Sequence, residues 1–321
     1  MGRSPLLDSG PVALIDFRYH IVSLTAVFLA LAVGVVLGTT ALKGPVLNNL
    51  KSRVSGLATE NKGLRNDLRD LRTQSGKTDA FAGEVAPALL PGRLTGKTVT
   101  VVSGPGASTA DRDAVVADLS VAGAKVVSRV RLASDFTDPK RSAEIKALVS
   151  QLLPPGVQVP ESTEGSVQAG ALLGAVLVKG NGSAVPPASS SAVVSGFQSL
   201  GLMSFDGKPD TADVAVLMTA QPLTGSANKP RNAAMLGFVS EFDKLGRATV
   251  LAGDTVKGDG NIMGAVRGDD AIAKRLSTVD DVNLAAGQVA VVLALAAEVK
   301  GVSGQYGIGS GATSRVPPLP S

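Results

Sequence analysis

The sequence has no cysteine, no tryptophan and a single histidine, His20. Without cysteine the chain can form no disulfide, no thiolate metal site and no thiol nucleophile. Because no histidine follows His20, the rest of the chain cannot build a Ser-His-Asp triad. Aromatic residues make up only 3% of the chain, too few to stack the bases of a nucleic acid. We therefore expect a protein that is neither an enzyme nor a nucleic-acid binder.

Positive charge is concentrated in one segment. The whole chain carries a net charge of +4, but residues 43–77 alone hold eight Lys/Arg and three acidic residues. The remainder of the chain is therefore slightly acidic. The basic excess belongs to this segment and does not indicate a nucleic-acid-binding domain.

A long apolar run, Tyr19–Leu42, follows a short N-terminal tail of residues 1–18. As a helix it would be about 36 Å long, enough to cross a hydrocarbon core of about 30 Å. It predicts a retained transmembrane signal anchor, with the tail in the cytoplasm and the chain after residue 42 outside. The alternative is a cleaved signal peptide, because the small residues "TTA" before Leu42 form a possible cleavage site.

Small residues recur every four positions along this anchor, at Ala30, Gly34 and Gly38. This spacing is typical of membrane helices that pack closely together. The alternative is that glycine and alanine are simply common in such helices. His20 lies beside Arg18 and Tyr19, where we expect a contact with lipid headgroups rather than a metal ligand.

Residues 43–77 have a heptad pattern with one polar interruption, Asn61. The apolar positions of this pattern, spaced alternately by three and four, are Leu47, Leu50, Val54, Leu57, Leu64, Leu68 and Leu71. It predicts a coiled-coil stalk about 40 Å long that holds the chain in a parallel dimer or a higher homo-oligomer. A single asparagine at an a position favours a fixed register. The alternative is an amphipathic helix that lies on the chain's own globular domain.

The remainder of the sequence predicts three further segments. Residues 78–96, rich in Gly and Pro, predict a linker, and residues 301–321, rich in Gly, Ser and Pro, predict a disordered tail. Between them, residues 97–300 alternate β-branched apolar runs with helical patterns. The first unit is a strand at Thr98–Val102, a turn "SGPGAS", a helix ending at Leu119 and a second strand, "AGAKVVSRV". The alternation predicts an open, mostly parallel α/β domain of the Rossmann or flavodoxin type.

The α/β domain offers few candidates for chemistry. The turn "SGPGAS" lacks both the G-x-G-x-x-G fingerprint and a Walker lysine, so its glycines are explained by the turn itself. Asp206, Asp254 and Asp259 lie near the ends of predicted strands, where ligands bind in open α/β sheets. We assign no catalytic and no cofactor-binding residue. The internal methionines, predicted to pack in the core, are Met203, Met218, Met235 and Met263.

Three blocks of the sequence resemble the actinobacterial copper-transport MctB family. They are "FRYHIVSLTAVFLALAVGVVLG", the stalk block "LATENKGLRNDLRDL" and the later "LSTVDDVNLAAGQVAVVLAL". The resemblance covers about residues 15 to 300. It implies an envelope membrane protein linked to copper homeostasis and to the removal of copper from the cell. It supplies no copper ligands, so copper is implied by resemblance only and the metal site is unknown.

Two functions follow from these observations. One is a membrane-anchored component of copper efflux or copper tolerance. The other is a coiled-coil scaffold or binding protein that engages cell-wall or divisome partners. Both place the chain in the cell membrane or envelope as a single-pass protein. Both give it the membrane, itself, and envelope proteins or cell-wall polymers as partners.

Overall fold

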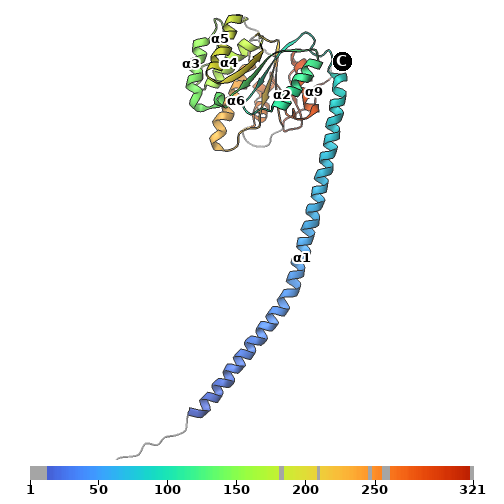
Figure 1. The fold of residues 1–321 in the computed structure, drawn as a ribbon, viewed down its shortest axis with the longest axis vertical. Helices are drawn as coiled ribbons and strands as arrows, with labels where there is room; N and C mark the ends of the chain where they lie inside the picture. Colours follow the sequence, from blue (N-terminus) through green and yellow to red (C-terminus); the bar gives the residue numbers. More distant parts are fainter. Residues whose placement is uncertain (1–12, 181–183, 208–209, 245–247, 255–260, 319–321) are drawn as a thin grey trace, which may run out of the picture. The chain divides into compact units, whose positions relative to one another are not determined.

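The computed structural model describes residues 13–180, 184–207, 210–244, 248–254 and 261–318, with the backbone alone described at 13–16 and 39–47. The chain divides into two compact units, Met1–Gln74 and Ser75–Ser321. One helix, α1 (Ala13–Leu89), forms the described part of the first unit and continues into the second (Figure 1).

The first unit contains an exposed apolar stretch of α1, Phe17–Gly38. It has 22 residues and a mean hydropathy of 2.6, and none of it is buried. Among the described helices it is the one that is long and apolar enough to cross a bilayer. This stretch overlaps the predicted anchor. The same helix continues without a break through the predicted stalk.

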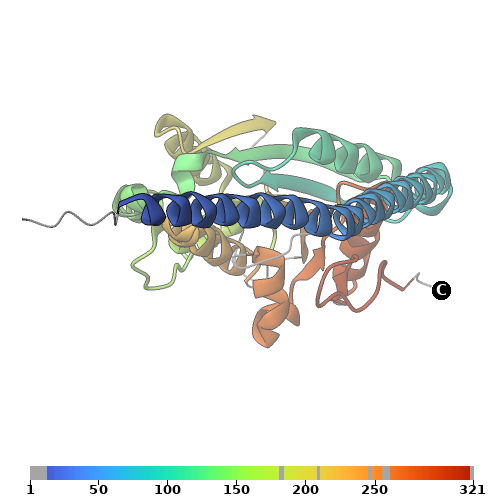
Figure 2. The ribbon, with the colours of Figure 1, turned by 90° about the horizontal axis from the view of Figure 1, so that it is seen from below.

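The second unit is built on a seven-stranded sheet. Its strand order is β3-β2-β1-β4-β5-β6-β7, and every pair is parallel except β2 with β3. Figure 2 shows β3 (yellow) at one margin of the sheet and α7 with α8 (orange) at the opposite margin. The strands are β1 (Thr98–Ser103), β2 (Lys125–Leu132), β3 (Met203–Gly207), β4 (Val214–Thr219), β5 (Ala248–Gly253), β6 (Ser277–Val279) and β7 (Gln305–Tyr306).

Helices cover both faces of this sheet. In Figure 1, α2 and α9 lie together, and α3 to α6 lie on the other side. The helices are α2 (Thr109–Val121), α3 (Ser142–Leu152), α4 (Gly165–Leu177), α5 (Pro187–Ser199), α6 (Lys229–Phe242), α7 (Ile262–Gly268), α8 (Asp270–Ala273) and α9 (Ala285–Glu298). Three short 3-10 turns, η1 (Ser134–Thr137), η2 (Pro139–Arg141) and η3 (Ser226–Asn228), complete the described elements. The predicted α/β fold is confirmed.

The central strands are buried on both faces, which explains their continuous apolar runs. Successive side chains of β4 point to opposite faces. Val216 joins the apolar cluster formed with α2 and α9, whereas Leu217 joins the cluster formed with α4 and α6. Each face therefore requires an apolar helix. This is why α4 and α9 carry few polar side chains along their lengths.

Two glycines of α4 let it approach α6 at backbone distance. A Cβ atom on Gly170 would lie 2.5 Å from the Phe238 carbonyl oxygen, and one on Gly174 would lie 2.6 Å from that of Phe242. Both contacts are shorter than real Cβ atoms allow, so any larger residue there must separate the helices. The close packing in turn places Phe238 against Phe136, with ring centroids 5.2 Å apart in an edge-to-face arrangement.

The predicted linker at 78–96 is wrong in its first half, where the chain is helical as far as Leu89. Its glycines and prolines suggested a loop, but tertiary contacts override that local preference. The backbone N–H of Ala286 donates to Asp79 at 3.4 Å. A Cβ on Gly83 would lie 3.6 Å from the Ala285 Cβ, and Ala86 is buried in the same apolar cluster as α9.

The predicted disorder of residues 301–321 is also wrong for the described residues up to 318. Tyr306 in β7 is only 3% exposed, and β7 pairs with β6. The Thr313 N–H donates to the Gln305 carbonyl at 2.7 Å. A composition rich in Gly and Ser did not reveal these long-range bonds. The sequence pattern also missed the short elements α7, α8, β6 and β7.

We predict that Gly174→Val destabilises the globular unit by about 3 kcal/mol, because the new side chain must enter the Phe242 backbone. Gly268→Ala, at the end of α7, is the matched control. Nothing lies within 4 Å of a Cβ there, so the change should stay within about 1 kcal/mol. Urea unfolding of residues 75–321 measures both. Equal stability of the valine variant and the wild type would contradict the close α4–α6 packing.

Candidate functional site

The carboxyl ends of the parallel strands form the edge where open α/β sheets bind ligands. The strand order reverses between β1 and β4. The chain leaves β1 through residues 104–108 toward α2 on one face, and leaves β4 through residues 220–228 toward α6 on the other. The Gly104 N–H donates to the Met218 carbonyl at 2.7 Å, which ties the two exits together.

A small crevice of about 280 Å³ lies at this reversal point. Ser108 lines this crevice and is also the N-cap of α2. Its hydroxyl accepts a hydrogen bond from the Asp111 N–H at 3.2 Å. The residues that line the crevice are Pro105, Gly106, Ser108, Asp111, Met218, Thr219, Ala220, Gln221, Leu223, Asp254 and Val282.

The charge of the crevice is negative. Its ionisable lining residues are Asp111 and Asp254, and no Lys or Arg is among the described residues that line it. Burial raises the pKa of Asp254, and the nearby Asp111 carboxylate raises it further. Two carboxylates would repel the phosphates that dinucleotide-binding proteins hold at this position. The crevice therefore does not fit a nucleotide cofactor.

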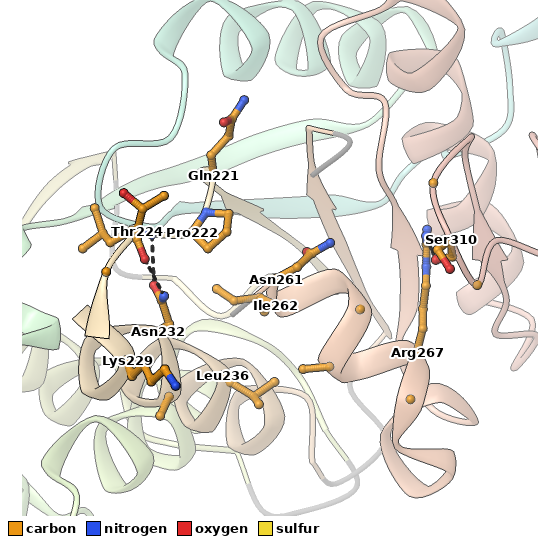
Figure 3. Close-up of a pocket in the computed structure, with 18 of the residues that line it drawn as sticks. Gln221, Pro222, Thr224, Lys229, Asn232, Leu236, Asn261, Ile262, Arg267 and Ser310 are labelled. Atoms are coloured by element: carbon orange, nitrogen blue, oxygen red, sulfur yellow. Dashed lines mark hydrogen bonds between the residues drawn. The ribbon is translucent and has the colours of Figure 1, made fainter. Parts of the chain in front are cut away.

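A larger cleft of about 1410 Å³ adjoins the crevice (Figure 3). One wall is the loop after β4 with the first turns of α6, from Gln221 to Leu236. The other wall is α7 together with the C-terminal segment Ile308–Gly311. Figure 3 places Asn232 and Lys229 on the first wall, and Arg267 and Ser310 on the second. These three stretches are far apart in sequence and meet only in the fold.

Asparagine side chains fix the first wall. The Leu223 N–H donates to the Asn232 side-chain oxygen at 3.2 Å, and the Asn232 amide donates back to the Leu223 carbonyl at 3.0 Å. The Asn228 amide donates to the Thr224 carbonyl at 2.8 Å. Gly225 makes the turn between them with φ of +91°, a conformation that favours glycine. The loop is therefore held in shape before any ligand arrives.

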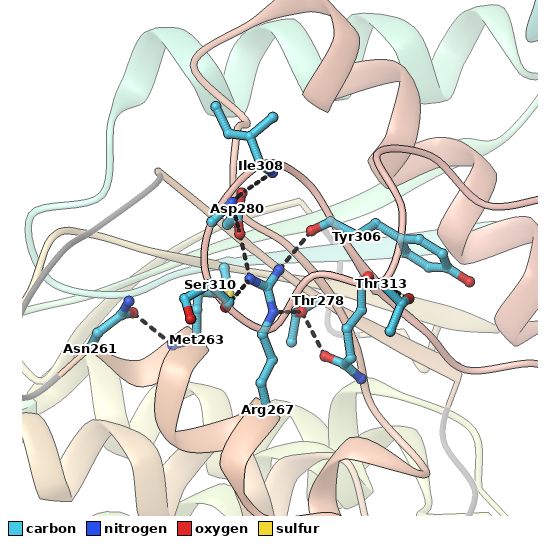
Figure 4. A network of polar contacts seen from close by, with 11 residues as sticks. Asn261, Met263, Arg267, Thr278, Asp280, Tyr306, Ile308, Ser310 and Thr313 are labelled. Carbon is cyan, nitrogen blue, oxygen red and sulfur yellow. Dashed lines mark hydrogen bonds and ion pairs between the residues drawn. The ribbon is translucent and has the colours of Figure 1, made fainter.

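A buried arginine fixes the second wall (Figure 4). The Arg267 side chain is 4% exposed and pairs with Asp280, which is 3% exposed. Its guanidinium also donates to the Tyr306 carbonyl at 2.6 Å and to the Ser310 carbonyl at 3.1 Å. A third bond runs from Nε to the Thr278 hydroxyl at 2.8 Å. One side chain from α7 thus holds β6 and the C-terminal segment together.

Asp280 completes this network from the other side. Its carboxylate accepts bonds from the Ile308 N–H at 2.8 Å and the Gly309 N–H at 2.9 Å. Gly307 has φ of +121°, and a Cβ there would lie 2.2 Å from an Asp280 oxygen. Only glycine fits at this position. The C-terminal segment is therefore anchored by the Arg267–Asp280 ion pair, and both side chains of the pair also form hydrogen bonds with the backbone of the segment.

The described lining of the cleft combines two cationic side chains with apolar and neutral polar groups. The charged residues among its described lining are Lys229 and Arg267, and Asp280 neutralises the second. Leu223 and Ile308 are 51% and 54% exposed and give it apolar surface. Its other polar groups are amides, hydroxyls and backbone. The described lining holds no acid, histidine or cysteine, so Lys229 and the hydroxyl groups are the side chains there that could act as a base or a nucleophile.

The predicted aspartates fall at different places. Asp254 does lie at the carboxyl edge, in the crevice. Asp206 does not, because β3 runs antiparallel, and this residue pairs across the sheet with Arg129 at 3.4 Å, away from the ligand edge. Asp259 lies outside the described residues. The antiparallel direction of β3 is the physical reason that the prediction for Asp206 is wrong.

The methionines pack in the core. Met203, Met218, Met235 and Met263 are each no more than 5% exposed. Met218 belongs to the cluster with α9, and the other three belong to the cluster on the opposite face. The Met235 methyl lies 2.8 Å from where a Gly104 Cβ would be, so the thioether fills space that the glycine leaves open. Among the described residues, no group of three His, Cys, Asp or Glu could hold a metal ion.

The predicted membrane and stalk residues lie along α1, and those whose side chains are described are exposed. Nothing lies within 4 Å of a Cβ added at Gly34 or Gly38, and Ala30 is exposed. Asn61 is exposed, and the side chain of Leu47 lies outside the described residues. The other seam residues, each between 53% and 65% exposed, are Leu50, Val54, Leu57, Leu64, Leu68 and Leu71. Their pairing stays a prediction.

Sequence reasoning missed Arg267 and Asp280, which organise one wall of the cleft. A signal was present, because "STVDD" combines a β-branched run with two acids at a strand end. The neighbouring Asp281 is fully buried, and burial raises its pKa although Arg315 lies 3.7 Å away. Acidic residues directly after a short apolar run, as in "STVDD", are therefore candidates for buried polar groups at a strand end.

The fold is a doubly wound α/β domain with two openings at one edge of its sheet, in a chain that has one candidate membrane span among its described helices. A family model described as "Copper transport outer membrane protein, MctB" matches residues 14–317. Relatives named "Copper transporter MctB" from Mycobacterium bovis and Mycobacterium tuberculosis H37Rv are 32% identical over 313 residues, 94% of this chain and 98% of theirs. One from Mycobacterium leprae is 32% identical over 314 residues, with the same coverage. This chain belongs to the MctB family.

We predict that Asp280→Ala destabilises the globular unit by about 3–5 kcal/mol, because it leaves Arg267 buried without its partner. The C-terminal segment should also lose its anchor, so limited proteolysis should cut near residues 307–313 before it cuts elsewhere. Asp113→Ala is the control, since Asp113 is 59% exposed in its pair with Arg112 and should cost under about 1 kcal/mol. Equal losses in both variants would argue against the buried network.

Proposed function

We propose that this protein is a membrane-anchored envelope component of copper homeostasis that helps to remove copper from the cell. The observation that carries the proposal is the family match along residues 14–317, with relatives named as copper transporters. The exposed apolar helix Phe17–Gly38 supports a single-pass anchor. In this proposal copper is cargo rather than a resident cofactor.

The physical chemistry of the chain limits how it takes part. One candidate span per chain cannot line a polar path by itself. The described head offers no cysteine and no histidine, and copper(I) prefers such soft ligands. We therefore infer that the chain acts as a homo-oligomer, joined along its seam residues and the Ala30, Gly34 and Gly38 face, or together with an envelope partner.

A scaffold or binding protein is the second candidate function. It is favoured by the large cleft, whose walls are fixed by side-chain bonds and which lacks soft metal donors among its described residues. In this case the head would engage cell-wall polymers or divisome proteins.

A deletion strain separates the two functions. We predict that it accumulates copper and stops growing at copper levels that the parent tolerates, and that the full chain restores tolerance. Leu57→Asp with Leu64→Asp should fail to restore it, because buried charges would break the seam. Ser55→Asp with Lys62→Asp, on the outer face of the same helix, should restore it. Unchanged copper content with wall or division defects would favour the scaffold instead.

We predict that residues 75–321 bind copper(I) only weakly, because their methionines are buried in two separate core clusters. Competition with a chromogenic chelator measures the affinity. Met235→Leu, which removes one buried thioether, should leave the result unchanged. A tight site with one copper per chain would show that the methionines rearrange to bind it.

We predict that the N-terminus lies inside and the stalk and head outside. Charge counting alone opposes this, because Lys43, Lys51, Arg53 and Lys62 follow the apolar stretch. Long domains, however, translocate largely regardless of charge. Protease treatment of intact protoplasts should remove a C-terminal tag. Protection until lysis would reverse the topology, and a mature N-terminus near Leu42 would indicate a cleaved signal.

A further inference from the structure

The stalk segment of α1 presents an uncovered apolar row. The six apolar a and d side chains from Leu50 to Leu71 are each more than half exposed, although they are the most apolar residues of the segment. Six such side chains in one row are unusual on a soluble surface, where large apolar residues are scattered. The row is as long as a helix of about 22 residues, roughly 33 Å.

Charged residues flank this row in a specific order. With Asn61 at an a position, Glu60 and Asp67 occupy g positions, and Arg65 and Arg72 occupy the e positions that follow them. All four are exposed, and none makes an ion pair within the described residues. Over residues 60–72 the acids lie on one side of the row and the bases on the other. The earlier g position, Arg53, is basic, and the e position that follows it is the uncharged Ala58.

This order fits one arrangement of two copies. In a parallel, in-register coiled coil, each g residue lies beside the e residue five positions later on the other chain. Glu60 then lies beside Arg65 of the second copy, and Asp67 beside Arg72 of the second copy. Symmetry doubles these to four opposite-charge pairs. Asn61 meets Asn61 of the second copy, so the buried amides pair with each other.

Other arrangements lose these contacts. In an antiparallel pair, e residues lie beside e residues, and the e positions Lys51, Arg65 and Arg72 are all basic. A shift by one heptad places Asp67 beside Asp79 of the second copy, which is acidic. It also places Asn61 against leucine or valine and leaves its amide unpaired. Like charges and orphaned amides therefore oppose both alternatives.

The head limits where the second copy can lie. Within the globular unit, the start of α9 contacts α1 through the Ala286–Asp79 bond and the approach of Ala285 to Gly83, and Ala86 is buried. The residues that continue the heptad there, Ala82 and Val85, are already half-buried by the chain itself. The uncovered row therefore ends before residue 79.

We propose that a second copy of this chain covers residues 50–74 of α1, parallel and in register, with Glu60–Arg65 and Asp67–Arg72 pairs between chains fixing that arrangement. The proposal rests on the self-association inferred in the proposed function and specifies its orientation and register. The surface is selective, because a different chain with the same apolar row but another charge order would meet like charges.

Charge reversal in the full chain, purified in detergent, tests the pairs. Glu60→Lys with Asp67→Lys makes both flanks basic, and Arg65→Glu with Arg72→Glu makes both acidic. Each variant alone should self-associate at least about tenfold more weakly than the wild type. Mixed together, the two should recover association, because every g–e contact is again between opposite charges. Sedimentation and co-purification of differently tagged chains measure this.

The matched control is Lys62→Glu with Arg69→Glu, which makes the same charge change at b positions away from the row. It should associate like the wild type. Wild-type association at the same level in the reversed variants, an equal loss in this control, or no recovery on mixing would each overturn the proposal. So would a wild-type chain that stays monomeric at tens of micromolar.

Orientation has its own readout, because the natural chain has no thiol. Leu50→Cys and Leu71→Cys lie at the two ends of the row. Each should form a disulfide with its own kind and not with the other. Cross-links between the two variants would indicate an antiparallel pair and would overturn the proposal.

These measurements need no copper, so their outcome is separate from that of the copper-tolerance experiment. A correct pairing with normal copper handling in the deletion strain would refute the proposed function alone. A wild-type chain that restores copper tolerance but stays monomeric would refute the proposed pairing alone.

Discussion

Burial of the central strands on both faces is the constraint on which the globular unit depends. Because β1, β4 and β5 expose no face to water, each side needs an apolar helix, and the chain must send successive connections to opposite faces. The reversal between β1 and β4 follows from that requirement. The crevice forms there because two neighbouring strands lead their loops apart. The crevice therefore results from the same chain path that places apolar helices on both faces of the sheet.

The residues that local patterns describe well are those whose environment is set by the sheet. The strand at Thr98–Val102, the turn and helix that follow it, and the second strand of that unit were predicted from the sequence. The end of α1 and the C-terminal segment could not, because their order depends on partners about 200 and 30 residues away, Ala286 and Asp280. Asp206 was predicted at the ligand edge because the local sequence does not indicate that β3 runs antiparallel to β2. The cleft walls come from three distant stretches, so no single motif marks them.

The two openings at the ligand edge have opposite chemistry although they share Gln221 and Leu223. The crevice ends in carboxylates, while the cleft is bounded by a lysine, amides and apolar side chains. A ligand that spans both would need a cationic or hydroxyl-rich end and a neutral or anionic body. Neither opening resembles the thiolate, imidazole or clustered thioether sites that copper(I) favours.

The anchoring of the C-terminal segment by Arg267 and Asp280 has a consequence for synthesis. Ile308–Gly311 supplies part of one cleft wall and leaves the ribosome after every other part of that cleft. Until then Arg267 and Asp280 can form their ion pair, but two sets of hydrogen bonds are missing. Arg267 lacks the carbonyls of Tyr306 and Ser310, and Asp280 lacks the N–H groups of Ile308 and Gly309. A nascent chain stalled before residue 306 therefore carries a nearly complete sheet and an open, polar-lined gap. This gap is accessible to chaperones and proteases until Ile308–Gly311 has been synthesised and packs against it.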